Sequence, residues 1–136
     1  MERSEESMVH TILLVDDEEA FLHPMKRMLA GPALAVDTAE TFDRAMTLLQ
    51  SKQYDAVIAD VRLGGVLSRE GLLILDHVKT WCSGTKVIIM TGHGSAGVEQ
   101  EVSRLEADHY CEKPVSYRVL SDVLTRLGVM DHDHIG

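Results

Sequence analysis

Short apolar runs alternate along the chain with stretches in which apolar and polar residues recur at helical spacing. The runs Ile12–Val15, Ala56–Ala59 and Val87–Met90 are each bounded by polar residues, a pattern typical of strands buried on both faces. The pattern predicts five strands, over Thr11–Val15, Ala33–Thr38, Tyr54–Asp60, Lys86–Thr91 and Asp108–Glu112.

The intervening stretches each carry an apolar stripe, which predicts amphipathic helices. Four of them are expected over Glu19–Ala30, Thr41–Ser51, Glu70–Trp81 and Ala96–Leu105, and the last begins after a cap at Ser116. The first apolar face comprises Phe21, Met25, Met28 and Leu29, and the last comprises Val119, Leu120, Val123, Leu124 and Leu127. Pro24 lies inside the first helix and removes one of its hydrogen bonds. Trp81 is expected at the edge of the core.

Strands that alternate with helices of about ten residues predict an α/β fold with a parallel sheet covered on both faces. A chain of 136 residues is long enough for one domain with a substantial core. We expect this domain over residues 11–128. Residues 1–10 are expected to form a flexible N-terminal segment, and residues 129–136, from Met130 onward rich in alternating Asp and His, a frayed tail.

Composition and charge exclude several classes of protein. The formal net charge is −9 and no cluster of Lys and Arg occurs, so we expect no direct contact with nucleic acid. No apolar run approaches the ~20 residues that a membrane helix needs, and the acidic N-terminus does not resemble a secretory signal. The two cysteines, Cys82 and Cys111, are expected to be reduced thiols in a cytoplasmic protein.

Polar residues follow the predicted strands where each strand ends. Asp16 and Asp17 follow the first strand and Asp60 ends the third, while Thr91 ends the fourth and Lys113 follows the fifth. The carboxyl ends of parallel strands meet at one edge, where open α/β sheets place their ligands. Three carboxylates at one edge repel one another unless a cation joins them, and their hard oxygens suit Mg²⁺. The ammonium and hydroxyl suit an anion bound beside that metal.

Each of these residues also has an ordinary structural explanation. An adjacent pair of aspartates after a strand is commonly the N-cap of the next helix, and a single Asp at a strand end is commonly part of a turn. Their joint occurrence at the same end of alternate elements is far more specific. A carboxylate such as Asp60, held at the end of a central strand, can act as a nucleophile on phosphorus.

The motifs in this order resemble the receiver domain of two-component response regulators, the chemotaxis-regulator-like fold, over about Thr11 to Leu127. The motifs that carry the resemblance are Ile12–Glu18, Asp60–Leu63, Met90–Gly92 and Tyr110–Pro114. The resemblance implies a flavodoxin-like, doubly wound, five-stranded parallel sheet in the order 2-1-3-4-5 with five helices.

The same resemblance implies a role for each site residue. Asp60 would be the phosphoacceptor and would act with Thr91 and Lys113. Asp16 and Asp17 would bind Mg²⁺ together with Asp60.

The remaining positions of the motifs also match. The main-chain carbonyl of Arg62 would be a further metal ligand, and Thr91 and Tyr110 would be the switch pair. Pro114 would follow the lysine through a bond that is often cis. Arg62 and His93 would border the path of the water that hydrolyses the phosphoryl group, which leads us to expect slow self-dephosphorylation.

Three positions depart from the usual pattern of the family. Gly64 stands where proline is usual, and the loop from Asp60 to Gly71 is longer than usual, so we expect the third helix and its partner docking to differ. Glu106 stands where a glycine commonly precedes the last strand. None of these departures touches the carboxylates.

The resulting prediction is a regulatory phosphoacceptor and not an enzyme in the ordinary sense. A sensor histidine kinase or phosphotransfer protein would supply the phosphoryl group, and the face of the fourth helix, fifth strand and fifth helix would serve output or homodimerisation. The alternative is a pseudo-receiver, a protein-interaction module without phosphate turnover. A related aspartyl phosphatase would need a second carboxylate two residues after Asp60, where Arg62 stands.

Overall fold

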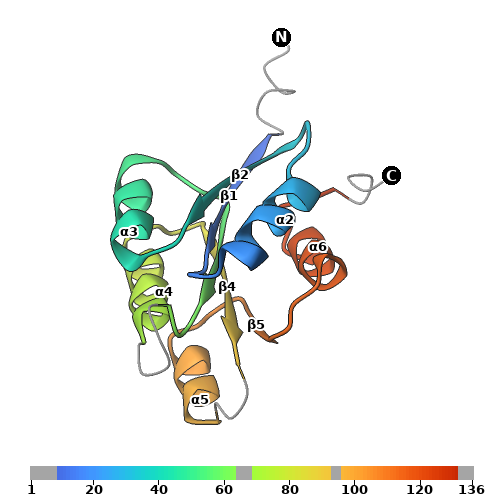
Figure 1. Ribbon diagram of the computed structural model, residues 1–136. Helices are drawn as coiled ribbons and strands as arrows, with labels where there is room; N and C mark the ends of the chain where they lie inside the picture. Colours follow the sequence, from blue (N-terminus) through green and yellow to red (C-terminus); the bar gives the residue numbers. More distant parts are fainter. Residues whose placement is uncertain (1–8, 64–68, 93–95, 132–136) are drawn as a thin grey trace.

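The computed structural model describes residues 9–63, 69–92 and 96–131, and this part of the chain alternates strand and helix (Figure 1). The strands are β1 (His10–Val15), β2 (Leu34–Ala39), β3 (Ala56–Asp60), β4 (Lys86–Thr91) and β5 (His109–Glu112). The helices are α2 (Glu19–Leu29), α3 (Phe42–Ser51), α4 (Glu70–Trp81), α5 (Ala96–Arg104) and α6 (Tyr117–Arg126). Every predicted element is present, and its boundaries agree with the prediction to within two residues.

The strands form one parallel sheet in the order β2-β1-β3-β4-β5, which confirms the predicted topology. All residues of β3 are buried, because this strand is central and helices cover both faces of the sheet. The register aligns Val15 with Ala59 and Asp60 with Met90, so the strands end close to the same level. The site residues that follow β1 and β5 and the one that ends β3 are therefore brought to one edge.

The core has two layers, one on each face of the sheet, and alternate residues of each strand contribute to each. Ile12 and Leu14 pack in the first core cluster with residues of α2 and α6, whereas Leu13 and Val15 pack in the second with residues of α3 and α4. Figure 1 shows α2 and α6 on one side of the sheet and α3, α4 and α5 on the other.

The burial of several side chains differs from the prediction. Met28 and Val119 were expected to face the core but are 48% and 41% exposed. In the first helix Leu22, which was not predicted to face the core, is buried instead of Met28, and in the last helix the predicted Leu120 is buried beside the exposed Val119. Trp81, expected at the core edge, ends α4 beyond its last buried residue and is 73% exposed. Met130, expected in a frayed tail, is buried in the first core cluster.

Local features explain how several elements begin and end. The Ser116 hydroxyl accepts the Val119 amide at 3.2 Å, which confirms the predicted cap of α6. Pro24 lies inside α2, which continues past it to Leu29. Glu106, at the position where the family commonly has glycine, adopts a left-handed backbone with φ 68°. Both cysteines are free thiols, as predicted.

Two further sequence predictions concern transmembrane helices and the loop after β3. Among the residues described, no helix is long and apolar enough to cross a membrane. Gly64 and most of the loop that leads to α4 lie outside the described residues, so the predicted effect of its length stays a prediction.

Candidate functional site

The residues that follow the strands are held in place by hydrogen bonds that extend the sheet one residue beyond its strands. The amide of Asp16 donates to the carbonyl of Ala39 at 3.1 Å. In the same way the amide of Lys113 donates to the carbonyl of Thr91 at 2.7 Å. The backbone that carries the site is therefore an extension of a rigid sheet, which is a good basis for fixing the positions of side chains.

Three carboxylates meet at this edge and are called the acid cluster below. Asp16, Asp17 and Asp60 each offer one oxygen, and these oxygens lie within 4.8 Å of one another. Asp16 and Asp60 are buried, and Asp17 is exposed. Clustered hard oxygens with one side open to solvent fit Mg²⁺, which keeps several waters when proteins bind it.

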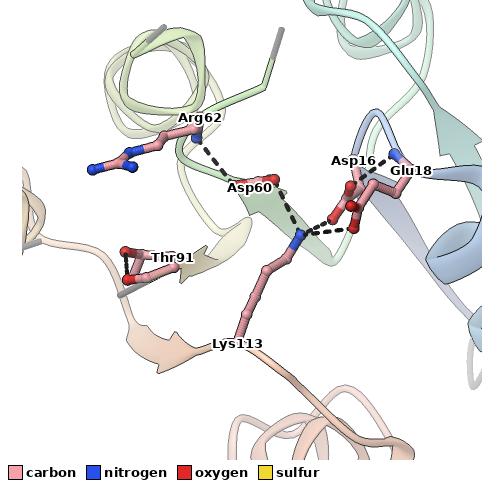
Figure 2. A network of polar contacts seen from close by, with 7 residues as sticks. Asp16, Glu18, Asp60, Arg62, Thr91 and Lys113 are labelled. Atoms are coloured by element: carbon pink, nitrogen blue, oxygen red, sulfur yellow. Dashed lines mark hydrogen bonds and ion pairs between the residues drawn. The ribbon is translucent and has the colours of Figure 1, made fainter. Parts of the chain in front are cut away.

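Lys113 brings one ammonium to the two buried carboxylates (Figure 2). Its Nζ lies 2.7 Å from Asp16 Oδ2 and 3.1 Å from Asp60 Oδ2. Glu18, whose role the sequence did not reveal, lies 3.7 Å from the same ammonium through its Oε1. A single cation thus neutralises part of a strongly negative site. The peptide bond after Lys113 is cis, as the resemblance implied.

In each buried carboxylate one oxygen accepts a backbone amide and the other faces Lys113. Asp16 Oδ1 accepts the amide of Glu18 at 2.9 Å and so satisfies a donor at the start of α2. Asp60 Oδ1 accepts the amide of Arg62 at 3.0 Å. The Oδ2 atoms of both residues face Lys113. The bond of Asp16 to the Glu18 amide and its place in the acid cluster are therefore compatible, because they use different oxygens.

Burial and charge act in opposite directions on the titration of this group. Burial raises the pKa of Asp16 above its usual value, and this effect outweighs the hydrogen bond from Lys113 that lowers it. Burial lowers the pKa of Lys113, but its hydrogen bond and attraction to Asp16, together with the charge of Asp60, raise it further than burial lowers it. Lys113 is therefore charged at neutral pH.

The predicted switch residues lie at the end of β4 and within β5. Thr91 is fully buried and its hydroxyl donates to the carbonyl of Gly92 at 3.0 Å, separate from Lys113 in Figure 2. Tyr110 is half-buried and packs against the second core cluster. The guanidinium of Arg62 extends away from the Asp60 carboxylate in Figure 2. His93, predicted to border the path of the attacking water, lies outside the described residues.

Gly71 supports the site in a way that the sequence did not reveal. A Cβ at this position would lie 2.3 Å from the carbonyl oxygen of Asp60 and 2.5 Å from Cα of Val61. The amide of Gly71 donates to the carbonyl of Val61 at 3.1 Å. The first turn of α4 therefore rests directly on the backbone of the phosphoacceptor candidate, and its glycine, which marks only the end of a loop in the sequence, permits this contact.

Two cavities differ in their relation to the acid cluster. The smaller, of about 350 Å³, is lined by Glu18, Phe21, Gly92, Lys113, Pro114 and Val115 and opens beside the ammonium. The larger, of about 600 Å³, is lined by residues 49–55 and 81–85, which directly precede β3 and β4. The larger cavity thus lies at the amino edge of the sheet, away from the acid cluster. The convergence of three carboxylate oxygens marks the acid cluster, and not this cavity, as the candidate functional site.

Comparisons with known proteins identify relatives of the chain. It is 33% identical over 105 residues to the alginate biosynthesis transcriptional regulatory protein AlgB of Pseudomonas putida, which covers 77% of this chain and 23% of that protein. It is 30% identical over 103 residues to the DNA-binding transcriptional regulator NtrC of Salmonella typhimurium, covering 76% of this chain and 21% of that protein. The chain thus spans less than a quarter of the length of either regulator.

Solved structures of receiver domains share the fold. A CheY-like receiver domain protein of Methanospirillum hungatei has a TM-score of 0.78 and 26% identity, covering 88% of this chain and 94% of that one. A receiver domain protein of Clostridium thermocellum has a TM-score of 0.77 and 29% identity with the same coverage. The family description "response regulator receiver domain" matches residues 12–125. The chain therefore belongs to the response regulator receiver domain family of two-component systems.

Proposed function

We propose that this protein is a phosphorylation-dependent signalling switch that accepts a phosphoryl group on Asp60 in a Mg²⁺-dependent reaction. The observation that carries the proposal is the acid cluster, in which three carboxylate oxygens lie within 4.8 Å of one another and Lys113 bridges the two buried ones. A partner sensor histidine kinase or phosphotransfer protein would supply the phosphoryl group, and we expect this exchange in the cytoplasm.

The chemistry needs positioning and charge neutralisation more than covalent help. An Asp60 carboxylate oxygen forms the new bond to phosphorus while the bond from phosphorus to the donor histidine nitrogen breaks, and the departing nitrogen keeps the electron pair. Asp16, Asp17, Asp60 and the main-chain carbonyl of Arg62 would hold Mg²⁺, which when bound neutralises phosphoryl charge. Lys113 then moves its contact from the carboxylates to a phosphoryl oxygen, as a point charge suited to phosphate.

The switch would follow from the new charge on Asp60. The Thr91 hydroxyl, which donates to the Gly92 carbonyl, would turn towards a phosphoryl oxygen. Tyr110, half-buried beside the second core cluster, would turn further inward. These changes alter the face of α5, β5 and α6, which we propose as the face for output or homodimerisation. This chain, with its net charge of −9, would itself make no direct contact with nucleic acid.

Incubation with acetyl phosphate and Mg²⁺ tests the proposal. Intact mass should rise by one phosphoryl group in the wild type and stay constant in Asp60→Asn, which keeps the size of the side chain but removes its charge. The alternative, a pseudo-receiver that binds partners without phosphate turnover, predicts no mass change in either protein. A mass increase that survives in Asp60→Asn would place the phosphoacceptor elsewhere.

The phosphorylated form should be long-lived. Arginine is always charged and has no acceptor, so Arg62 cannot orient a water as a base would. Its side chain, which extends away from Asp60 in the structure, would turn towards a phosphoryl oxygen after phosphorylation. A bulky His93 would narrow the same approach. Arg62→Asn should present an amide to the water and shorten the lifetime of the phosphorylated form by a few fold. The decay is followed by mass after the phosphodonor is removed, and an equal or slower decay in Arg62→Asn would refute this role.

A further inference from the structure

The ammonium of Lys113 has an aromatic neighbour as well as its carboxylate partners. Its Nζ lies 5.5 Å from the centroid of the Phe21 ring, within the range of a cation–π interaction. The amide of Phe21 donates to the carbonyl of Glu18 at 3.0 Å, and its half-buried ring packs against the first core cluster. Phe21 thus lies in the first turn of α2, which directly follows the aspartate pair.

The surroundings of this contact strengthen it. Phe21 and Lys113 form part of the wall of the 350 Å³ cavity beside the acid cluster, together with Pro114 and Val115. The side chain of Lys113 is only 22% exposed, so little water competes for its ammonium. A cation–π contact is worth more when the cation is largely shielded from water.

We propose that Phe21 is a positioning residue for phosphoryl transfer, whose ring keeps the Lys113 ammonium at the reaction centre while its carboxylate partners change. The proposal rests on the proposed function. In the structure Asp16 and Asp60 hold the ammonium, but in the proposed reaction Asp16 would hold the metal and Asp60 would bond to phosphorus. The ring neither binds metal nor reacts, so its contact with the ammonium persists through the whole exchange.

Fluorination of the ring tests this role with little change in its size. Fluorine withdraws electron density from the ring face and so weakens the attraction of a cation. Phe21 is replaced in turn by 4-fluoro-, 3,5-difluoro- and 3,4,5-trifluorophenylalanine, and phosphorylation by acetyl phosphate and Mg²⁺ is timed by mass. The rate should fall stepwise, by about two- to tenfold across the series. Phe21→Trp should retain the rate, and Phe21→Leu should lower it at least as far as the trifluorinated ring does.

The chain provides a matched control. Phe42, its only other phenylalanine, is also half-buried but packs against the second core cluster. The same fluorinated residues at position 42 should leave the rate unchanged. In a Lys113→Met background the series at position 21 should be flat, because the cation is absent. A flat series at position 21 in the wild type, or a fall that persists in Lys113→Met, would overturn the proposal.

A spectroscopic measurement separates this proposal from the proposed function. With 4-fluorophenylalanine at both positions, Lys113→Met should shift the ¹⁹F resonance of residue 21 and leave that of residue 42 in place. An unshifted residue 21 would refute the contact itself. The resonance of residue 21 could shift as expected between wild type and Lys113→Met while the wild type takes up no phosphoryl group. That result would refute the proposed function and, with it, the role of the contact in phosphoryl transfer.

Discussion

The two edges of the sheet use the same residue types in opposite ways. At the carboxyl edge a single lysine is shared by Asp16 and Asp60. Away from that edge, Asp37 and Asp108 each have partners of their own. Asp108 accepts Lys79 at 2.7 Å and the amide of Val87 at 2.8 Å, which joins α4 to the start of β4.

Asp37 provides the clearest contrast with the acid cluster. Its Oδ2 accepts the ammonium of Lys52 and the hydroxyl of Tyr54, each at 2.6 Å, so the α3–β3 turn is fastened to β2. Burial raises the pKa of Asp37, but these two hydrogen bonds and the attraction of the Lys52 and Lys26 charges together lower it by more, and the net shift is downward. The pKa of Asp16 shifts upward. The fold thus gains stability from Asp37 and tolerates an unfavourable charge at Asp16, as expected where a residue is kept for binding.

The largest expected effect concerns the glycines of the two edges. Gly71→Ala should cost about 3 kcal/mol of unfolding free energy, because its Cβ would overlap the backbone of Asp60 at the carboxyl edge. At the amino edge Gly84 has open space but a φ of +96°, so Gly84→Ala should cost only about 1 kcal/mol through backbone strain.

Urea denaturation of both variants and of their asparagine counterparts separates the two causes. Asparagine tolerates the left-handed region, so Gly84→Asn should recover much of the loss, whereas Gly71→Asn should be at least as damaging as Gly71→Ala. Equal costs at the two positions would contradict the view that the carboxyl edge is limited by space.

Mg²⁺ should stabilise the folded protein by binding at the acid cluster of the carboxyl edge. A ligand present at a concentration ten times its Kd adds about 1.4 kcal/mol to the free energy of unfolding if it binds only the folded state. Because carboxylate sites that retain waters bind Mg²⁺ weakly, we expect a Kd in the millimolar range. The added stability should vanish in Asp17→Asn, because one of the three oxygens is lost. Asp37→Asn is the matched control and should keep the full increment. Thermal melts with and without Mg²⁺ measure it, and an increment retained in Asp17→Asn would place the metal elsewhere.

Neutralising Asp37, in the middle of β2, and Asp16, at the carboxyl edge, should change stability in opposite directions. At about pH 7, Asp37→Asn should lower the unfolding free energy by about 1 kcal/mol, a figure reduced for partial exposure. Asp16→Asn should raise it by a similar amount, since it removes a buried charge while Lys113 keeps its contact with Asp60.

The pH dependence follows from the signs of the two shifts. The contribution of Asp37 is present above its unfolded pKa of 3.8 and is lost as the pH falls through its lowered folded pKa. Protonated Asp16 favours folding below 3.8, and that benefit is lost as the pH rises through its raised folded pKa. Both differences from wild type should therefore shrink in acid. Urea denaturation of both variants and the wild type across this pH range measures these differences. If both variants changed stability in the same direction at neutral pH, the contrast between Asp37 and Asp16 would be wrong.

The order of the strands and the meeting of the three carboxylates were predictable, because both follow from where the buried strands begin and end in the sequence. Buried parallel strands must be continuous apolar runs, and the residues after them must meet at one edge. Asp16, Asp60 and Lys113 are brought together for that reason, although they are far apart in the sequence.

Features that depend on how a helix rotates or how closely it approaches were not predicted. Met28 and Leu22 both fit a helical stripe, and only packing against the sheet decides that Leu22 is buried. The contact of Gly71 with the Asp60 backbone and that of Phe21 with Lys113 depend on distances between elements. Spacing along a sequence carries no information about such distances.

The smallest effect concerns Glu106, an exposed residue with a φ of 68° just before β5 at the amino edge. A non-glycine residue is destabilised by about 1–2 kcal/mol in this conformation. Glycine avoids this cost, but it loses more conformational entropy on folding, which offsets part of the gain in stability. Glu106→Gly should therefore raise the unfolding free energy by about 0.5 kcal/mol. Glu106→Asn should give a smaller gain of the same sign, and Glu106→Ala none. Because this strain is remote from the acid cluster, the stability gained from Mg²⁺ should be unchanged in all three variants. Urea denaturation with and without Mg²⁺ measures both quantities, and a loss of stability in Glu106→Gly would show that the Glu106 side chain contributes more to the α5–β5 turn than its backbone costs.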